Sequence, residues 1–458
     1  MKTIKYLFLA LSVLSCNVLD QVSPNDVADG SVFDSEDGAN AALIGLYSSM
    51  QSRDYYGGYY PLVADLYSDI GTAGGFDNVA LDEINILDVT TANIITENIW
   101  LSIYGTIAGA NAIVERVGLV SDPGFTQTEK DHIKGQALAI RALAHFDLLR
   151  MFGEHWNSSS AFGIPVVTKI QKASDVVARS GVSAVYDAIL ADLTAAATLV
   201  DGDERSTEFM NVVAIKALAS RVQLYRGNKT AAASLATEVI EDGQYELLDA
   251  GSIEKIYTSP YRASESLFEL TFDIQNRSAY NAATFSRTNA LRTEVLFLAE
   301  NSLNSFFADR PGDVRSEFLD FENNDESILP DGRSLKYRGE ETRDNPAYII
   351  RLAEVYLIRA EAKGLAGGLA DLNAVRTSRG LEELKSSDLG GAEEFIDALL
   401  DERKAELNFE GSRMFDLART GRSTDVLGIE AYQRIFPIPL REIIATRGVI
   451  KQNPGYPD

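Results

Sequence analysis

Residues 347–363, AYIIRLAEVYLIRAEAK, decide the fold that this sequence predicts. Their apolar side chains recur three and four positions apart, which places them along one face of an α-helix. Arg351, Glu354 and Glu361 fall on the opposite face. The stretch therefore predicts an amphipathic helix that packs its apolar face against the rest of the chain.

Two further helices are predicted after this one. Gly364 is placed to end the first helix, and residues 369–376 resume the helical pattern, which stops at Gly380. These segments predict a helical hairpin. A third helix is predicted from Ala392 to Thr420, so that the C-terminal part of the chain is a set of packed helices.

The middle of the chain also carries helical patterns. Residues 212–245 form a predicted helix–turn–helix of the length of a tetratricopeptide unit. Ala-Leu-Ala runs at 142–144 and 217–219 provide small side chains that let helices approach closely. Residues 265–272 alternate in polarity as a strand does. We expect a scaffold of helical repeats interrupted by a region with little regular structure.

Four segments, in this order, resemble the C-terminal signature of the SusD/RagB family of glycan-binding outer-membrane lipoproteins. They are RLAEVYLIRAEA (351–362), LNAVR (372–376), ERKAELNFEGSRMFD (402–416), and FPIPLRE (436–442) with QNPGY (452–456). The resemblance implies a mainly α fold, in which a tetratricopeptide-like helical repeat scaffold packs with an irregular loop-rich region and few short strands. It also implies a protein without catalytic activity that captures oligo- or polysaccharide and passes it to a TonB-dependent, SusC-like barrel.

The N-terminus has the features of a lipoprotein signal. Lys2 and Lys5 precede an apolar run, residues 6–14, that is too short to span a bilayer. Cys16 follows, and it is the only cysteine of the chain. A single cysteine forms no internal disulfide, so its simplest use is to carry lipid, although export with a free thiol is the alternative. We expect an outer-membrane protein, anchored by lipid at Cys16 and exposed at the cell surface.

These observations and the resemblance together predict the organisation of the chain. The segments are a signal peptide at 1–15, a lipidated tether at 16–35, and a single SusD-like domain at 36–458, with helical repeats in 94–245 and 347–420 and a loop-rich glycan-binding insertion at 250–346.

Charge excludes one class of partner and disfavours another. The formal net charge is -25, and removal of the signal peptide with its two lysines would lower it to -27. Nucleic-acid binding needs clustered Lys and Arg, so nucleic acid is not an expected partner. The same charge disfavours polyanionic glycans, and the expected ligand is therefore a neutral one.

A first group of candidate glycan-binding residues lies early in the chain. The loop at 71–78 is rich in glycine, and it holds an aromatic ring beside two short polar groups, in Phe76, Asp77 and Asn78. An aromatic ring can stack on a sugar while polar groups bind its hydroxyls. Tyr59 belongs to a tyrosine-rich segment, 53–61, which suits either sugar recognition or the capping of helices.

A second group lies in the insertion, where members of the family vary and bind sugar. Its segment 276–289 is polar with two spaced aromatic residues. The candidates there are Tyr280, Asn281, Phe285, Arg287 and Asn289.

The two tryptophans have structural interpretations as well. Trp100 shares a helix face with apolar neighbours, which favours a place in the core. Trp156 lies in a turn, where it suits either a surface stacking residue or a plug under the turn.

Catalytic and metal-binding motifs are absent from the sequence. It has no nucleophile elbow, phosphate loop, dinucleotide-binding glycine pattern or zinc-protease motif. The acidic residues near 77–88 lack the spacing of a calcium loop. We therefore expect no enzyme activity, no metal and no cofactor. The alternative function is a tetratricopeptide-type adaptor that binds a peptide or protein at the outer membrane.

Overall fold

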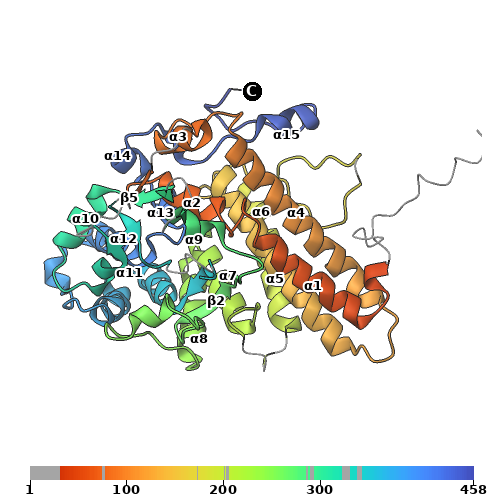
Figure 1. The fold of residues 1–458 in the computed structure, drawn as a ribbon, viewed down its shortest axis with the longest axis horizontal. Helices are drawn as coiled ribbons and strands as arrows, with labels where there is room; N and C mark the ends of the chain where they lie inside the picture. The colour runs from red at the N-terminus through yellow and green to blue at the C-terminus, as the bar shows by residue number, and fades with distance from the viewer. Residues whose placement is uncertain are drawn as a thin grey trace, which may run out of the picture.

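The computed structural model describes residues 31–74, 78–172, 174–200, 202, 206–284, 287–288, 293–294, 296–321, 331–337 and 343–457. Helices α1, α4, α5 and α6 lie side by side in one half of the molecule, and the other half holds α11 and α12 with shorter helices, loops and small strands (Figure 1). The prediction of a mainly helical fold with few short strands is confirmed.

Consecutive long helices pack against one another. The first set starts with α1, which has the predicted bounds, and α6 is packed between α5 and α7. The helix pair α7–α8 is the predicted helix–turn–helix, and α8 packs on α11, which packs on α12. The long helices are α1 (Glu36–Met50), α4 (Ile94–Arg116), α5 (Gln127–Phe152), α6 (Val182–Leu199), α7 (Val212–Arg226), α8 (Lys229–Glu241), α11 (Leu352–Ser378) and α12 (Ala392–Leu407).

The shorter elements connect and cover these helices. The remaining helices are α2 (Tyr59–Leu66), α3 (Val79–Asn85), α9 (Ala279–Thr284), α10 (Asn301–Ala308), α13 (Arg413–Thr420), α14 (Ser423–Leu427) and α15 (Leu440–Ala445). The described strands form antiparallel pairs, β1 (Gly71–Ala73) with β5 (Phe297–Ala299), β2 (Ser266–Leu270) with β8 (Ala347–Arg351), β3 (Arg287–Thr288) with β4 (Thr293–Glu294), and β6 (Leu319–Asp320) with β7 (Arg333–Ser334).

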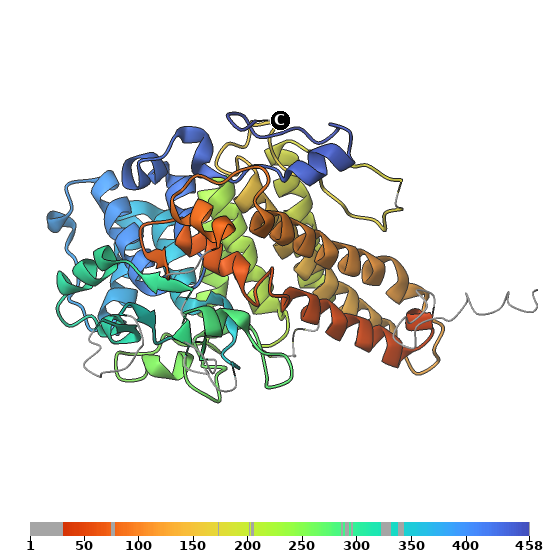
Figure 2. The same ribbon diagram turned by 45° about the horizontal axis from the view of Figure 1, so that its top comes forward.

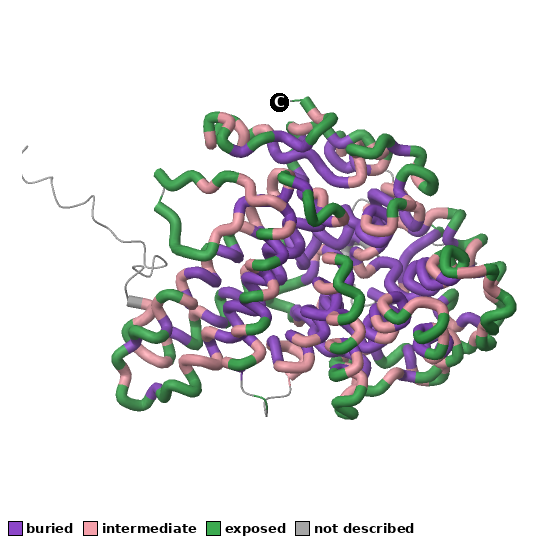
Figure 3. Tube along the Cα trace, turned by 180° about the vertical axis from the view of Figure 1, so that it is seen from behind, coloured by how far each residue is buried: buried purple, intermediate pink, exposed green. Residues whose placement is uncertain are grey.

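Small side chains let the long helices approach closely, as the Ala-Leu-Ala runs predicted. Ala142, Leu143 and Ala144 of α5 are fully buried. A side chain at Gly135 would lie 2.8 Å from Val200, so α5 meets the end of α6 through a glycine. Buried residues run through the centre of the whole molecule (Figure 3).

The prediction that Trp100 belongs to the core is confirmed, and one apolar helix is buried in part. Trp100 is only 2% exposed and contacts the ring of Phe152 edge to face, so it belongs to the core. Among the described helices, α6 alone is long and apolar enough to cross a membrane. Its Val182, Val185 and Tyr186 are fully buried against neighbouring helices, as expected of a core helix.

The prediction that a helix begins at Ala347 is wrong at its first turn. Residues 347–351 form β8, which pairs with β2, and α11 begins only at Leu352. All five residues of β8 are buried. Tyr348, Ile349 and Ile350 favour a strand because aromatic and β-branched side chains pack well on a pleated surface. Pairing with β2 therefore outweighs the helical spacing of the apolar residues in 347–351.

The predicted hairpin inside α11 is confirmed at Gly364. This residue has φ 64° and ψ −176°, which no helix contains. The chain turns back there, so that a side chain at Gly368 would lie 2.0 Å from the carbonyl oxygen of Ala360. Glycine at position 368 is needed for this close approach.

The third C-terminal helix is two helices, α12 and α13, which corrects the prediction of one continuous element. The break contains Phe409 and Gly411, with φ of 60° and 71°. Lys336 donates hydrogen bonds to the carbonyl oxygens of Glu406 and Asn408, at 3.0 and 2.8 Å. Buried partners thus satisfy the backbone groups that the break leaves without helical hydrogen bonds.

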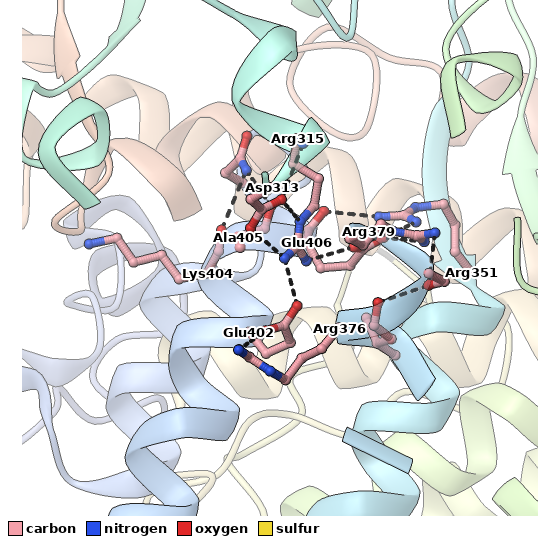
Figure 4. Close-up of polar contacts among 12 residues, drawn as sticks. Asp313, Arg315, Arg351, Arg376, Arg379, Glu402, Lys404, Ala405 and Glu406 are labelled. Atoms are coloured by element: carbon pink, nitrogen blue, oxygen red, sulfur yellow. Dashed lines mark hydrogen bonds and ion pairs between the residues drawn. The ribbon is translucent and has the colours of Figure 1, made fainter. Parts of the chain in front are cut away.

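Buried ion pairs join the insertion to the C-terminal helices (Figure 4). Glu406 of α12 lies at the centre, and its two carboxylate oxygens accept hydrogen bonds from Arg315, Arg351 and Arg379 at 2.8–3.0 Å. Each of these side chains is at most 1% exposed. Arg351 and Glu354 were expected on a polar helix face. Both are buried instead, and each is paired with a side chain of opposite charge, which makes the burial of its own charge tolerable.

The network extends on both sides of Glu406. Glu265 of the segment before β2 accepts hydrogen bonds from Arg351 and Arg379, both at 2.8 Å. Glu402, one turn before Glu406, pairs with Arg315 at 2.6 Å. Although burial acts to raise it, the charges of Arg379 and Arg351 hold the pKa of Glu406 well below its ordinary value. Each of these buried charges is therefore stabilised by the opposite charges that surround it.

We predict that Glu406→Gln destabilises the fold strongly. It removes the negative charge that three buried guanidinium groups share, and the loss of one partner of a buried pair costs about 3–5 kcal/mol. Urea denaturation followed by circular dichroism measures the effect. Glu393→Gln is the matched control, because Glu393 pairs with Arg422 at the surface and is 81% exposed. An equal loss of stability in both variants would contradict the prediction.

Candidate functional site

The pairing of β1 with β5 determines which loops meet. Ala73 lies opposite Phe297 and Gly71 lies opposite Ala299. The backbone N–H of Gly74 continues the ladder with a 3.0 Å hydrogen bond to Leu296. In an antiparallel pair, the chain that leaves one strand and the chain that enters the other lie at the same end. Gly74, where the chain leaves β1, and Leu296, where it enters β5, therefore lie at the same end, and we call this place the ribbon end.

A small hairpin stands at the ribbon end. Arg287 pairs with Glu294 and Thr288 pairs with Thr293 in strands β3 and β4. The N–H of Leu296 donates to the carbonyl of Ala283 at 2.9 Å, which closes the base of the segment. The described part of the ribbon end thus consists of Gly74 from the N-terminal part and the β3–β4 pair from the insertion.

Gly71 permits the ribbon because the ring of Phe297 lies where a side chain would be. A Cβ atom at this position would lie 1.9 Å from the ring. Asn85, at the end of α3, then fixes β1 from the other side. Its side-chain oxygen accepts hydrogen bonds from the N–H of Ala73 at 2.8 Å and the hydroxyl of Thr72 at 3.3 Å.

Asn78 lies beside the ribbon end and begins α3. Its side-chain oxygen accepts hydrogen bonds from the N–H groups of Ala80 and Leu81, both at 3.2 Å. This is the N-cap arrangement that asparagine favours. The cap uses only the oxygen, so the amide N–H donors of Asn78 have no partner among the residues that the structure describes.

The base of the ribbon is attached to the C-terminal helices through Asp69. Its carboxylate accepts hydrogen bonds from Arg413 at 2.6 Å and from Lys404 at 2.8 Å. Burial acts to raise the pKa of Asp69, but the hydrogen bonds and charges of Arg413 and Lys404 outweigh it and lower the pKa to about 2. Ser68, the residue before Asp69 in the connection from α2 to β1, is also buried. These contacts fix the position of the start of β1.

Two candidate glycan-binding residues of segments 71–78 and 276–289 have a described backbone close in sequence to the ribbon end. Asn78 and Arg287 lie in the described parts of these segments. The other candidates in them, Phe76, Asp77, Phe285 and Asn289, lie outside the described residues. Cys16 also lies outside them.

Tyr280 and Asn281 do not face solvent, which corrects their expected place on a binding surface. They are 2% and 1% exposed, in α9. The Tyr280 hydroxyl donates to the carbonyl of Phe409 at 2.9 Å, and its ring contacts that of Tyr337 edge to face. The helix buries these residues because they pack on the break between α12 and α13. They support the segment that carries the hairpin.

Most of the tyrosine-rich segment is also core. Tyr55 and Tyr56 donate hydrogen bonds to the same carboxylate oxygen of Asp147, at 2.6 and 2.7 Å. Tyr59 is half-buried, and Arg53 lies 4.9 Å from its ring centre and donates to its hydroxyl at 2.6 Å. Tyr59 begins α2, two residues after Gly57, whose carbonyl accepts a 2.8 Å hydrogen bond from the N–H of Tyr280.

Trp156 is covered on one side. The guanidinium of Arg434 lies 3.8 Å from the centre of its ring, and His155 contacts it edge to face. Trp156 is half-buried. Of the two interpretations, the structure favours a plug under the turn.

Some residues that position the site were missed by the sequence analysis. Gly71 was assigned only to an irregular loop, and Asp69 and Asn85 were given no role. Gly71 fits against Phe297 and Asp69 pairs with Arg413, and both partners lie far away in sequence. No local pattern indicates such pairings, although the position of Gly71 between a helix and a glycine-rich loop was visible.

Comparison with known proteins places the chain in a family. A family profile described as "Starch-binding associating with outer membrane" matches residues 18–224, and the profile of the SusD family matches residues 330–434. The chain belongs to the SusD/RagB family. The SusD-like protein P2 of Formosa agariphila is 23% identical over 99% of both chains.

Solved structures of family members share the fold. A SusD superfamily protein of Bacteroides thetaiotaomicron has a TM-score of 0.82 and 24% identity, covering 91% of this chain and 99% of that one. A laminarin-binding SusD-like protein has a TM-score of 0.77 and 25% identity, covering 92% of this chain and 100% of that one. The tetratricopeptide-like helical fold expected from the sequence is thereby confirmed.

We predict that Asp69→Asn changes how stability depends on pH. The folded pKa of about 2 lies below the ordinary value of 3.8, so ionised Asp69 stabilises the fold above pH 3.8 and this contribution disappears as the pH falls toward 2. At pH 6 we expect the variant to lose about 2 kcal/mol. Urea denaturation at pH 6, 4 and 3 measures the difference between variant and wild type. A difference that stays constant over this range would contradict the assignment.

Proposed function

We propose that the chain is a cell-surface lipoprotein that captures a neutral oligo- or polysaccharide at the ribbon end and passes it to a TonB-dependent, SusC-like barrel. The observation that supports the proposal is the β1–β5 pairing, because the strand that precedes the segment with Phe76 lies beside the strand that follows the segment with Arg287. Membership of a glycan-binding, outer-membrane-associated family supports it.

The chemistry proposed for capture is stacking combined with hydrogen bonds. Phe76 and Phe285 would supply the faces on which sugar rings stack, and Asp77, Asn78 and Asn289 would bind hydroxyl groups. Asn78 supports this role because its amide donors are not used by the helix cap. Such a site binds without breaking a bond, so no catalytic group is needed.

Net charge and relatives both favour a neutral glycan. A chain with a formal charge of -25 repels polyanionic ligands unless basic residues converge on the site. One solved relative is a laminarin-binding protein, and another, with a TM-score of 0.73, is a surface glycan-binding protein in complex with laminarihexaose. Laminarin is a neutral glucan, which makes it a suitable first probe.

We predict that the lipid-free protein, residues 17–458, binds a neutral glycan and that Phe76→Ala and Phe285→Ala each weaken binding at least fivefold. Stacking of a nucleic-acid base on an aromatic side chain is worth about 1–3 kcal/mol, and we take the lower end of this range for a sugar ring. Calorimetry against laminarin, starch-type glucans and an acidic polysaccharide measures affinity, and chromatography of the glycan afterwards detects any hydrolysis.

Phe33→Ala is the control for this titration, because Phe33 is a half-buried aromatic residue beside Arg116 at the end of α4. That end of α4 lies on the opposite side of the molecule from β5 (Figure 1). This variant should bind as the wild type does. Release of shorter sugars would argue for catalysis, and equal losses in all three variants would argue against a site at the ribbon end. Binding of the acidic polysaccharide alone would refute a neutral ligand.

We further predict that Cys16→Ser releases the protein from the membrane. Acyl chains contribute about 0.8 kcal/mol for each methylene buried in lipid, so two or more chains on Cys16 would hold the protein firmly. Fractionation of cells with an antibody against the protein measures its distribution. If the variant remained with the membrane after a salt wash, another anchor would have to exist.

A further inference from the structure

Two buried carboxylates have no ion pair within the part of the chain that the structure describes. They are Asp65 of α2 and Glu269 of β2, and both are fully buried. Every other buried aspartate or glutamate in that part is paired with an arginine. A buried charge without a partner is costly, because the protein interior solvates it far less well than water does. Each of these two residues therefore needs another means of neutralisation.

Asp65 has backbone donors in place of a cation. Its carboxylate accepts hydrogen bonds from the N–H groups of Gly411, Ser412 and Arg413 at 2.8–3.1 Å. These groups lie at the start of α13, where the unpaired N–H groups of a helix favour a negative charge. Burial raises the pKa of Asp65 to about 7, and the three donors oppose that rise.

Glu269 has a single hydrogen-bond donor. Its Oε1 accepts the backbone N–H of Arg262 at 2.8 Å, and its Oε2 is buried without a partner among the described residues. The Ser266 hydroxyl lies beside this carboxylate and is likewise buried without a partner there. Thr207 adds a third such oxygen, and its carbonyl accepts the backbone N–H of Glu269 at 2.8 Å. The carboxylate therefore lacks the donors that an ionised group needs.

The charged and ionisable groups that face Glu269 do not neutralise it. The guanidinium of Arg262 pairs with Glu208 at 2.6 Å, and the Arg262 side chain is 55% exposed. Glu208 itself adds a charge of the same sign as that of an ionised Glu269. The phenols of Tyr261 and Tyr348 also lie near this carboxylate, and burial raises the pKa of both. Glu269 thus faces one arginine that is already paired, one acid and two neutral phenols.

A proton on Glu269 would remove both defects of the site. Burial has the largest effect on this carboxyl group and raises its pKa to about 7, and the Ser266 hydroxyl and the Arg262 N–H offset this rise only in part. A protonated carboxyl group carries an O–H donor, and a serine hydroxyl can accept from it. Protonation therefore removes the unpaired charge and provides partners for Oε2 and for Ser266.

A bound cation is the other means of neutralisation, and the site offers too few ligands for it. Calcium takes about 6–8 oxygen ligands. Among the described residues here, the oxygen atoms without a partner are Glu269 Oε2, Ser266 Oγ and Thr207 Oγ1. A proton fits this site better than a metal ion does.

The position of Glu269 gives its proton a structural effect. Glu269 lies opposite Tyr348 in the β2–β8 pair. Both strands contact α7, which is drawn in light green near the middle of the molecule in Figure 2. Thr207 belongs to the segment that leads into α7, and Arg262 belongs to the turn that leads into β2. Ionisation of Glu269 would draw water to the carboxylate and weaken the contacts of both segments with β2.

We propose that Glu269 is a buried carboxylic acid that takes up a proton from water in the neutral pH range and donates it in a hydrogen bond to Ser266, so that residues 206–208 and 261–262 loosen from β2 when the proton is lost. This inference is independent of the proposed function.

The first test compares Glu269→Gln with the wild type, each as the mature lipoprotein in mild detergent. Glutamine has the shape of the neutral acid and carries no charge at any pH. The folded pKa of about 7 lies above the ordinary value of 4.5, so the wild type loses stability as the pH rises from 4.5 to 7, and the loss is complete above 7. Urea denaturation should show the folding constant of the variant, relative to wild type, rising by up to about tenfold for each pH unit in this range and levelling off above it.

Asp65→Asn is the matched control, because it also converts a fully buried carboxylate without an ion pair into an amide. Its new NH₂ group would face backbone donors at the start of α13. We expect this variant to be less stable than the wild type at pH 8, where Glu269→Gln should be more stable. A gain in stability for both variants would show that the effect does not belong to the Glu269 site.

Infrared spectroscopy detects the proton directly and does not depend on the control. A protonated carboxyl group has a carbonyl stretching band that an ionised one lacks. The wild-type spectrum minus that of Glu269→Gln should contain this band at pH 6 and lose it by pH 9. Hydrogen exchange in residues 206–210 and 261–270 should be faster in the wild type than in the variant at pH 8 and equal at pH 6.

Three results would overturn the inference. If the band were absent at pH 6, or if the stability difference stayed constant with pH, Glu269 would be ionised throughout. If Ca²⁺ or Na⁺ stabilised the wild type but not Glu269→Gln, a cation would occupy the site in place of the proton. Equal hydrogen exchange at pH 8 would refute the loosening of the two segments.

Discussion

Charge neutralisation inside the core is the constraint on which the rest of the structure depends. Glu406 is fully buried and touches three guanidinium groups, from Arg315, Arg351 and Arg379. These arginines come from the insertion, from β8 and from the end of α11, so a single carboxylate joins three parts of the chain that are distant in sequence. Buried charges are tolerated only when they are paired, which means that these three parts must assemble together.

This assembly gives the loop-rich half a rigid base. The break between α12 and α13 is filled by Lys336 and Tyr280, whose hydrogen bonds replace those that a continuous helix would make. Asp69 then ties the start of β1 to the same two helices. The ribbon end therefore projects from a supported position, and the preorganisation of a binding loop in this way reduces the entropy lost when a ligand binds.

The sequence predicted the elements that depend on the local spacing of apolar residues. It failed where residues distant in sequence determine the secondary structure or the burial of a side chain. The helix pair α7–α8 and the burial of Trp100 followed from spacing alone. Residues 347–351 have a helical pattern yet form a strand, because β2 offers hydrogen bonds that no local rule reveals. Tyr280 looked like a surface aromatic because its neighbours are polar, but Tyr337 and Phe409 bury it. The two candidate segments were found by composition, whereas the pairing of the strands next to them is known only from the β1–β5 register.

The β1–β5 pairing also determines which positions of the sequence can change during evolution and which cannot. Gly71 and Phe297 fit each other so closely that neither can change alone, and they set the register of the two strands. The ladder ends with the hydrogen bond between Gly74 and Leu296. Insertions, deletions and substitutions in the segments after Gly74 and before Leu296 would leave the paired strands unchanged. Ligand preference can therefore diverge during evolution through two short, independent segments, with the helical scaffold left unaltered.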